Sequence, residues 1–318
     1  MSTLPPVLVL TSGDEPPLHL MSAIPYVAGS RPEDFAEIAS QAEVLFSWSG
    51  SRDLLRTVFL ACPHLRWVHS RSAGVDGTLF PELVASPVPL TNGSGVFSQS
   101  LGEFALAAVL FFAKDFHRML RNQRAARWEQ FEVEEIAHQV AGIVGYGDIG
   151  RAVARRFNAM GMQVLALKRN PPAQPDPLIA GFYKPADLAA MLGRCDYVVA
   201  AAPLTPQTRH MISDAAFAAM KPNAVVINVG RGPVVDQAAL LRALSGKKIR
   251  GAGLDVFEQE PIPPADPIWH LENVLISPHT ADRTRTWHDE AMRFFIAQYE
   301  RFQKGEPLEN VVEKHLGY

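Results

Sequence analysis

The sequence has little cysteine, no surplus of positive charge and no apolar run long enough to cross a bilayer. Cys62 and Cys195 are the only cysteines among 318 residues, which argues against a disulfide framework and against a cysteine metal site. With 30 basic and 33 acidic side chains the net charge is −3, so neither nucleic acid nor an anionic membrane is an expected partner. The longest apolar stretch, FALAAVLFFA after Glu103, is far shorter than the roughly 20 residues of a membrane span.

The N-terminal segment MSTLPPVLVLTSGDE also lacks the features of a targeting sequence. No basic residues precede its short apolar run, two prolines stand ahead of that run, and acidic residues follow it. This pattern favours a first β-strand over a signal peptide. Together with the low cysteine content, it predicts a cytoplasmic protein.

Short apolar runs alternate with helical patterns along the chain, which is typical of wound α/β structure. The length predicts two domains. Six strands expected beyond residue 140 match a complete nucleotide-binding sheet. The amphipathic stretch Trp287 to Lys304 lies beyond that sheet and is expected to cross back to the first domain. The expected strands are Val7 to Leu10, Val44 to Trp48, Arg66 to His69, Val88 to Thr91, Val140 to Val144, Val164 to Leu167, Tyr197 to Ala201, Ala224 to Asn228, Gly251 to Val256 and Val274 to Ile276.

Residues 98–122 depart from this pattern, because they predict an almost wholly apolar helix. Ser100 and Glu103 have the spacing of a capping box, which places the helix start in SQSLGEF. A helix that is apolar on every side is buried on two faces, so we expect this one between domains or between subunits. A twofold homodimer is the predicted assembly.

A glycine-rich turn, GYGDIG, follows the strand expected at Val140 to Val144 and opens a helix. In the dinucleotide-binding fingerprint the first glycine allows a tight turn, the second lets the backbone approach a pyrophosphate, and the third permits close helix packing. The N–H groups at the helix start also face phosphates. A glycine turn without a ligand is the alternative. The cofactor-binding residues predicted here are Gly145, Tyr146, Gly147, Asp148, Ile149 and Gly150.

The end of the next strand predicts which dinucleotide binds. An acidic residue there accepts hydrogen bonds from the adenosine ribose and selects NAD, but this chain has Lys168 and Arg169, and no acid before Asp176, which follows a proline-rich stretch. Two cations suit a 2′-phosphate, so NADP(H) is expected in preference to NAD(H), which stays open as a second cofactor. Arg169 is expected to be the main contact and Lys168 the more exposed one. A solvated loop end is the alternative.

Polar side chains stand at three further strand ends, where ligands of open α/β sheets bind. VVINVGRG carries Arg231, GAGLDVFEQEP carries Asp255 and Glu260, and VLISPHTA carries His279. A guanidinium binds a carboxylate, an imidazole moves a proton near neutral pH, and a glutamate orients that imidazole. The remaining histidines show no paired metal-ligand spacing, so no metal is predicted and surface or capping positions are expected for His64, His69, His117, His138, His210, His270, His288 and His315.

These segments, with SAGVD at Ser72 to Asp76, resemble the D-isomer-specific 2-hydroxyacid dehydrogenases, a family that includes phosphoglycerate dehydrogenase and the glyoxylate/hydroxypyruvate reductases. The resemblance covers essentially the whole chain. It implies a Rossmann cofactor domain, residues 101–286, inserted in a flavodoxin-like substrate domain, residues 1–100 and 287–318. It also implies Arg231, Glu260 and His279 as catalytic residues, with Arg231 and His279 in contact with substrate.

Further site residues follow from the same resemblance. The glutamate of the family directly precedes a proline, so Glu260 carries the role and Glu258 does not. Gly74 and Val75, with Ala73, are implied as the loop that binds the substrate carboxylate. Arg71 precedes that loop and adds either a cation for a dianionic acid or only a solvated side chain. The implied cofactor contacts are Pro203, Thr208, Val229, Gly230, Asp255 and His279.

The predicted function is an NADPH-preferring reductase of small 2-oxo acids such as glyoxylate or hydroxypyruvate, specific for the D-isomer. Two alternatives stay open. One is a nucleotide-sensing binding protein like the transcriptional corepressors that resemble this family. The other is an NAD-dependent D-hydroxyacid dehydrogenase that acts on a different acid.

Overall fold

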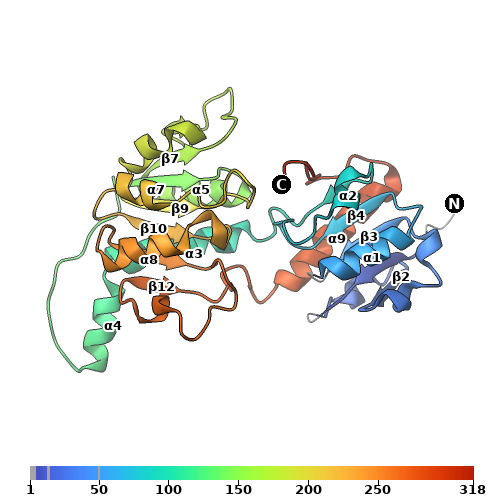
Figure 1. The fold of residues 1–318 in the computed structure, drawn as a ribbon, viewed down its shortest axis with the longest axis horizontal. Coiled ribbons are helices and arrows are strands. Elements are labelled where there is room, and N and C mark those ends of the chain that lie inside the picture. Colours follow the sequence, from blue (N-terminus) through green and yellow to red (C-terminus); the bar gives the residue numbers. More distant parts are fainter. Residues whose placement is uncertain (1–4, 13–14, 49–50) are drawn as a thin grey trace. The chain divides into compact units, whose positions relative to one another are not determined.

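The computed structural model describes residues 5–12, 15–48 and 51–318, so parts of the N-terminal segment MSTLPPVLVLTSGDE lie outside the described residues. The chain forms two compact units (Figure 1). Unit 1 combines the chain up to Phe97 with Thr284–Tyr318, and unit 2 is Ser98–Arg283. The chain thus enters and leaves unit 2 close to the boundaries expected after residues 100 and 286.

Unit 1 contains a five-stranded parallel sheet in the order β2-β1-β3-β4-β5, which is the flavodoxin order. The runs VLVL and VLFS are buried along their whole length, as expected for central strands covered on both faces. The fold class predicted for this part of the chain is confirmed. The strands are β1 (Val7–Leu10), β2 (Tyr26–Gly29), β3 (Val44–Ser47), β4 (Trp67–Ser70) and β5 (Leu90–Thr91).

Helices cover both faces of this sheet. The C-terminal helix α9 (Trp287–Lys304) packs its Phe295 ring on Phe46 of β3, with 4.0 Å between ring centroids, so its predicted return to the first domain is confirmed. Helix α1 (Arg52–Ala61) buries Leu54, Leu55 and Val58 in the cluster on the other face. The remaining short helices are η1 (Leu18–Met21), η2 (Pro32–Phe35), η3 (Ala39–Gln41) and α2 (Pro81–Ala85).

His69 corrects an expectation about the histidines. It lies on β4 and is buried, not at the surface or in a cap, and its Nδ1 is 2.7 Å from Thr91 Oγ1. Its ring packs among Phe46, Trp67 and Phe295. Burial lowers the pKa of His69 to about 3, so it stays neutral as part of the core.

Unit 2 contains a seven-stranded parallel sheet in the order β12-β11-β10-β9-β6-β7-β8. Counted from β6, this is the Rossmann order 3-2-1-4-5-6 with one strand added, so the predicted nucleotide-binding sheet is confirmed. The strands are β6 (Val140–Val144), β7 (Gln163–Leu167), β8 (Gly181–Tyr183), β9 (Tyr197–Ala200), β10 (Val225–Asn228), β11 (Gly251–Leu254) and β12 (Val274–Ile276).

The apolar helix differs from its prediction. It begins at Ser98, and the expected capping box does not form, because Ser100 Oγ donates to the Ala281 carbonyl and Glu103 pairs with Arg156. It also breaks at Asp115, whose φ of 49° and side chain start a second helix. The helices of unit 2 are α3 (Ser98–Ala113), α4 (Phe116–Arg124), α5 (Asp148–Ala159), η4 (Pro185–Asp187), α6 (Leu188–Leu192), α7 (Asp214–Ala219), η5 (Gly232–Val234), α8 (Gln237–Ser245) and η6 (Pro267–His270).

The first of these helices, α3, packs within unit 2, against α5 and the strands β10 and β11. The added Cβ of a residue in place of Gly102 would lie 3.1 Å from the Ala152 backbone, which shows how closely α3 approaches α5. One face of α3 is therefore buried in its own unit rather than between domains. In the described part of the chain, none of the helices is long and apolar enough to cross a membrane.

Candidate active site

The glycine-rich turn connects β6 to α5 at the carboxyl end of the strand. Gly145 has a φ of +99°, and a Cβ there would lie 2.5 Å from the Ala202 backbone, so this position accepts only glycine. A Cβ at Gly150 would lie 2.4 Å from the Gly145 carbonyl oxygen, while the space beside Gly147 is open. Gly147 is the N-cap of α5 and provides no side-chain cap. The first N–H groups of α5, including those of Asp148 and Ile149, are therefore placed to receive a phosphate.

The adenosine end of this site is formed by the loop after β7. Lys168 is partly buried and Arg169 is exposed, which reverses their expected exposures. The Lys168 backbone is bonded to Tyr183 of β8, and its Nζ lies 5.8 Å from the centre of the Tyr146 ring. Strand β8 was not predicted. Its hydrogen bond to the Lys168 backbone holds Lys168 against the sheet, whereas the sequence suggested a residue in an exposed loop.

Asp176 lies in the proline-rich loop at residues 171–177, but its side chain does not face solvent. Its carboxylate is buried, with 9% of the residue exposed, and accepts hydrogen bonds from the Tyr146 hydroxyl at 2.9 Å and from Arg151 Nη1 at 3.0 Å. Sequence analysis did not identify Arg151 or the Tyr146 hydroxyl as parts of this site. In the sequence, only the acidic residue after the prolines pointed to these contacts. An acidic residue in a loop does not by itself show that the loop folds back onto the glycine-rich turn.

Two further turns border the glycine loop. After β9, which pairs with β6, Thr208 Oγ1 donates to the Pro203 carbonyl at 2.6 Å. After β10, the buried Asn228 side chain accepts from the Gly230 N–H at 3.1 Å and donates to the Arg231 carbonyl at 3.1 Å. The turn that contains Val229 and Gly230 is thus held by a residue that the sequence analysis overlooked, although an asparagine at a strand end is a recognisable signal for a turn.

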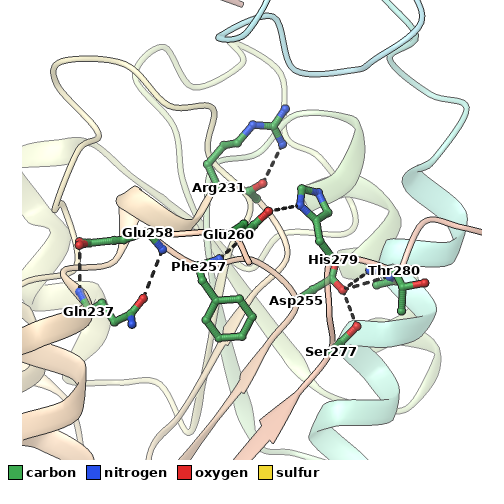
Figure 2. Close-up of polar contacts among 11 residues, drawn as sticks. Arg231, Gln237, Asp255, Phe257, Glu258, Glu260, Ser277, His279 and Thr280 are labelled. Atoms are coloured by element: carbon green, nitrogen blue, oxygen red, sulfur yellow. Dashed lines mark hydrogen bonds and ion pairs between the residues drawn. The ribbon is translucent and has the colours of Figure 1, made fainter. Parts of the chain in front are cut away.

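His279 and Glu260 form the pair that the sequence predicted. Nδ1 of His279 lies 2.6 Å from Oε2 of Glu260 (Figure 2). The hydrogen bond that His279 donates to Glu260 raises the pKa of His279 above its usual 6.5, against the opposing effect of burial. Burial favours a higher pKa for Glu260, but its bonds to His279 and to the Phe257 N–H keep that pKa below its usual value. The pair therefore favours imidazolium beside carboxylate.

Asp255 supports the turn that presents this histidine. Its buried Oδ1 accepts from Ser277 Oγ at 2.5 Å and from the N–H groups of Thr280 at 2.9 Å and Ala281 at 3.0 Å (Figure 2). The His279 N–H donates to the Asp255 carbonyl, and the φ of His279 is 51°. This uncommon backbone conformation for a residue with a side chain is maintained by four hydrogen bonds that one aspartate accepts. Within the described residues, Oδ2 of Asp255 is buried and makes no hydrogen bond.

Arg231 stands at the end of the β10 turn, where its Nη1 donates to the Gly230 carbonyl at 2.9 Å. Figure 2 shows its side chain beside Glu260 and His279, and its charge helps to lower the pKa of Glu260. The next residue, Gly232, packs directly against the backbone of Phe257. A Cβ at position 232 would lie 1.8 Å from the Phe257 carbonyl oxygen, so only glycine allows this approach. The segments that carry Arg231 and Glu260 are therefore in direct backbone contact.

Glu258 lies apart from the His279 pair. Its Oε1 is 2.7 Å from His210 Nε2, and its backbone and side chain exchange hydrogen bonds with Gln237 at the start of α8 (Figure 2). These contacts brace the segment that carries Glu260. Among the described residues, no group of three or more His, Cys, Asp or Glu side chains is arranged to hold a metal ion.

The loop at residues 72–76 belongs to unit 1, at the carboxyl end of β4. Ser72 and Ala73 are fixed through their carbonyls by Gly93 N–H and Asn92 Nδ2. Within the described chain, the N–H groups of Gly74 and Val75 have no hydrogen-bond acceptor. Two backbone donors are therefore left for a ligand.

Arg71 is held at the start of this loop rather than simply solvated. Its guanidinium carbon lies 4.9 Å from the centre of the Trp48 ring and 4.7 Å from that of Trp287, within the range of cation–π attraction. Sequence analysis did not identify the two tryptophans.

Comparisons with known proteins agree with this geometry. Residues 106–281 match the family model for the D-isomer specific 2-hydroxyacid dehydrogenase, NAD binding domain. A glyoxylate reductase of Korarchaeum cryptofilum is 35% identical over 81% of this chain and 79% of its own length. An NADPH-dependent glyoxylate/hydroxypyruvate reductase of Sinorhizobium meliloti, solved with NADP and sulfate, is 29% identical with a TM-score of 0.86 over 99% of this chain and all of its own. A D-isomer specific 2-hydroxyacid dehydrogenase of Xanthobacter autotrophicus, solved with NADPH and MES, is 29% identical with a TM-score of 0.84 over 99% of both chains.

The resemblance noted in the sequence is thus confirmed by a family model over more than half of the chain and by a relative above 30% identity. The chain belongs to the D-isomer specific 2-hydroxyacid dehydrogenase family, whose members are NAD(P)-dependent oxidoreductases.

Proposed function

We propose that this protein is a reductase of small 2-oxo acids, with glyoxylate and hydroxypyruvate as substrates, NADP(H) as the preferred cofactor and the D-isomer as product. The observation that carries the proposal is the 2.6 Å contact between His279 and Glu260, close to Arg231. This set provides a proton donor, a group that orients it and a cation for a carboxylate. The glyoxylate reductase and the glyoxylate/hydroxypyruvate reductase that this chain resembles favour an enzyme over a corepressor-like protein.

The proton is assigned to one atom of His279. Because Nδ1 is bonded to Glu260, Nε2 is the nitrogen that donates to the carbonyl oxygen of the substrate. The bound cofactor supplies the hydride that the carbonyl carbon accepts. Glu260 keeps the imidazole protonated before transfer, and its carboxylate fixes the ring orientation.

Arg231 is proposed to bind the substrate carboxylate and to polarise the carbonyl group. A planar guanidinium pairs with a carboxylate through two parallel hydrogen bonds. The N–H groups of Gly74 and Val75 are proposed as substrate-binding groups of unit 1, with Ala73 in the same loop. With these roles, unit 2 is the proposed cofactor domain and unit 1 is the proposed substrate domain.

The cofactor residues are proposed as predicted: the turn Gly145 to Gly150 for the pyrophosphate, Lys168 and Arg169 for the 2′-phosphate, and the turns after β9 and β10 for the nicotinamide half. Pro203, Thr208, Val229, Gly230 and Asp255 belong to this last group. The free Oδ2 of Asp255 supports its inclusion. The Sinorhizobium meliloti reductase that this chain resembles binds NADP, which also supports the preference for NADP(H).

We also propose a homodimer in the cytoplasm. Helix α4 and the segment after it expose Phe116, Met119, Leu120, Trp128 and Val133, and Trp128 is 94% exposed. A patch of this kind is suited to a second copy of the chain. Both cysteines are free and buried, and burial raises the pKa of Cys62 to about 11 and that of Cys195 to about 12, which is suited to a reducing compartment.

The test is a panel of 2-oxo acids with each cofactor, measured as kcat/KM. The proposal predicts saturable oxidation of NADPH with glyoxylate and hydroxypyruvate, and a lower kcat/KM with NADH. Tight cofactor binding without turnover on any acid would favour a sensor. Turnover only with NADH and a different acid would instead favour the NAD-dependent alternative.

A further inference from the structure

The buried carboxylate of Asp176 joins two parts of the proposed cofactor site that are distant in sequence. Tyr146 stands between the first two glycines of the pyrophosphate turn, and its hydroxyl donates to Asp176 Oδ2 at 2.9 Å. Asp176 belongs to the loop that begins with Lys168 and Arg169. One hydrogen bond across 30 positions therefore ties the pyrophosphate turn to the loop that carries the two cations.

The same oxygen also holds a third cation. Arg151, in the first turn of α5, donates through Nη1 to Asp176 Oδ2 at 3.0 Å, while its side chain is 52% exposed. A guanidinium has five N–H groups, so one fixed by Asp176 leaves others for a ligand. Lys168 is also near, because its Nζ lies 5.8 Å from the centre of the Tyr146 ring, whose hydroxyl is bonded to Asp176.

Asp176 itself is not available as an acceptor for a ribose. Its Oδ2 accepts hydrogen bonds from the Tyr146 hydroxyl and from Arg151, and its Oδ1 accepts one from the Leu178 N–H at 3.0 Å. The carboxylate is also buried. In NAD-binding members of this fold an acidic residue accepts hydrogen bonds from the ribose hydroxyls. Asp176 is instead buried and bonded to other residues of the protein.

The Tyr146 ring is fixed by its neighbours. Tyr146 is buried, and its ring packs edge-on to Phe182 of β8 with 5.5 Å between centroids. Burial and the Asp176 carboxylate raise the pKa of Tyr146 to about 12, so its hydroxyl remains a donor at any working pH. Lys168 lies over the face of the same ring. The Tyr146 ring and the Asp176 carboxylate are thus held together, with Lys168 over the ring and Arg151 bonded to the carboxylate.

We propose that Asp176 is a positioning residue for the 2′-phosphate of NADP(H): it holds Arg151 and Tyr146 in place, and Arg151 joins Lys168 and Arg169 in binding that phosphate. This inference rests on the proposed preference for NADP(H) and names the residues that create it. The proposed site then contains three cations and one carboxylate, which leaves a net positive charge for a phosphate of charge about −2. The effect is confined to the adenosine end, so the reaction at His279 is not altered.

The experiment measures binding of adenosine 2′,5′-bisphosphate and AMP by titration calorimetry, together with NADP⁺ and NAD⁺. The unmodified protein is expected to bind the bisphosphate more tightly than AMP. Arg151→Ala is expected to weaken bisphosphate and NADP⁺ binding by about 10-fold, the effect of one charge-assisted hydrogen bond. Binding of AMP and NAD⁺ is expected to change by less than about twofold, because the lost contact is to the 2′-phosphate alone.

Two variants of Asp176 separate positioning from charge. Asp176→Ala is expected to weaken bisphosphate binding by about 3- to 10-fold, and Asp176→Asn, which keeps an acceptor for Tyr146, by less. Tyr146→Phe keeps the ring and is expected to shift binding in the same direction by a smaller amount. If Asp176→Ala does not fold, Asp176→Asn and Arg151→Ala decide the outcome. Asp187→Ala, which removes an exposed acid in η4, is the matched control and should leave all four affinities unchanged.

Three results would overturn the inference. Tighter bisphosphate binding by either Asp176 variant would mean that the carboxylate only repels the phosphate. Equal losses for the bisphosphate and AMP would mean a purely structural role. Unchanged affinities in Arg151→Ala would remove that residue from the site. The proposed cofactor preference fails separately, if the unmodified protein binds the bisphosphate no better than AMP.

Discussion

Nδ1 of His279 lies 2.6 Å from Oε2 of Glu260, and the turn that carries His279 is held at the same time by the buried Oδ1 of Asp255. One carboxylate therefore sets the proton affinity of the imidazole, and another sets the position of its backbone. This division of roles explains why Asp255 is buried while the His279 side chain is partly exposed.

Removal of the imidazole should abolish most turnover. His279→Ala is expected to lower kcat for 2-oxo acid reduction by about two to four orders of magnitude, the usual contribution of a positioned general acid. The matched control is His64→Ala, because His64 is an exposed histidine that is not a proposed site residue. Steady-state kinetics of both variants check the prediction. Near-normal turnover of His279→Ala would exclude it from the mechanism.

The pH dependence of reduction should reflect the pKa of His279 beside Glu260. Reduction needs protonated His279, whose pKa is raised above 6.5 by Glu260, so kcat/KM should fall as pH rises through that higher value. Glu260→Gln removes the charge that raises the pKa, and the fall should then move to lower pH. Rate measurements across pH on both proteins are the test, and an unshifted profile in the variant would mean that Glu260 does not control the proton.

Arg231 should act on the substrate and leave the cofactor unaffected. An ammonium does not reproduce the two parallel bonds of a guanidinium, so Arg231→Lys is expected to lower kcat/KM for the 2-oxo acid by about 10-fold or more. The Kd for NADPH should stay within about twofold of that of the unmodified protein. Kinetic and binding measurements on the same preparation separate the two effects. A variant with weakened NADPH binding and full activity at saturating cofactor would show that the assignment is wrong.

The exposed apolar patch on α4 and the segment after it should be covered by a second copy of the chain. Light scattering at micromolar concentration is expected to give the mass of a dimer. Met119→Asp, which introduces a charge into the patch, is expected to shift the population toward monomer. A monomeric unmodified protein would contradict the proposal.

The central strands of both sheets were predictable from the sequence, and two of the edge strands were not. Central strands such as Val140–Val144 and Tyr197–Ala200 are buried apolar runs, so their pattern is evident. Strands β2 and β8 lie at sheet edges, are short and are only partly buried, so no apolar run marks them. The capping box at Ser100 failed because both of its side chains bind other segments, a tertiary effect that local spacing does not contain.

The candidate site divides in a similar way. Arg231, Glu260 and His279 follow strand ends of one parallel sheet, so topology alone brings them to one edge. The contacts of Asp176 were not predictable, because they depend on how a proline-rich loop returns to a turn 30 residues earlier in the chain. The exposures of Lys168 and Arg169 were wrong for the same reason, since β8 fixes Lys168 from outside the predicted strands.

The central claim is tested most directly by the product formed from hydroxypyruvate and NADPH. The purified protein is incubated with both, and the glycerate formed is quantified and resolved by chiral chromatography. The account predicts one glycerate for each NADPH consumed, all of it of the D configuration. Formation of L-glycerate, or no glycerate while the protein binds NADPH normally, would contradict it.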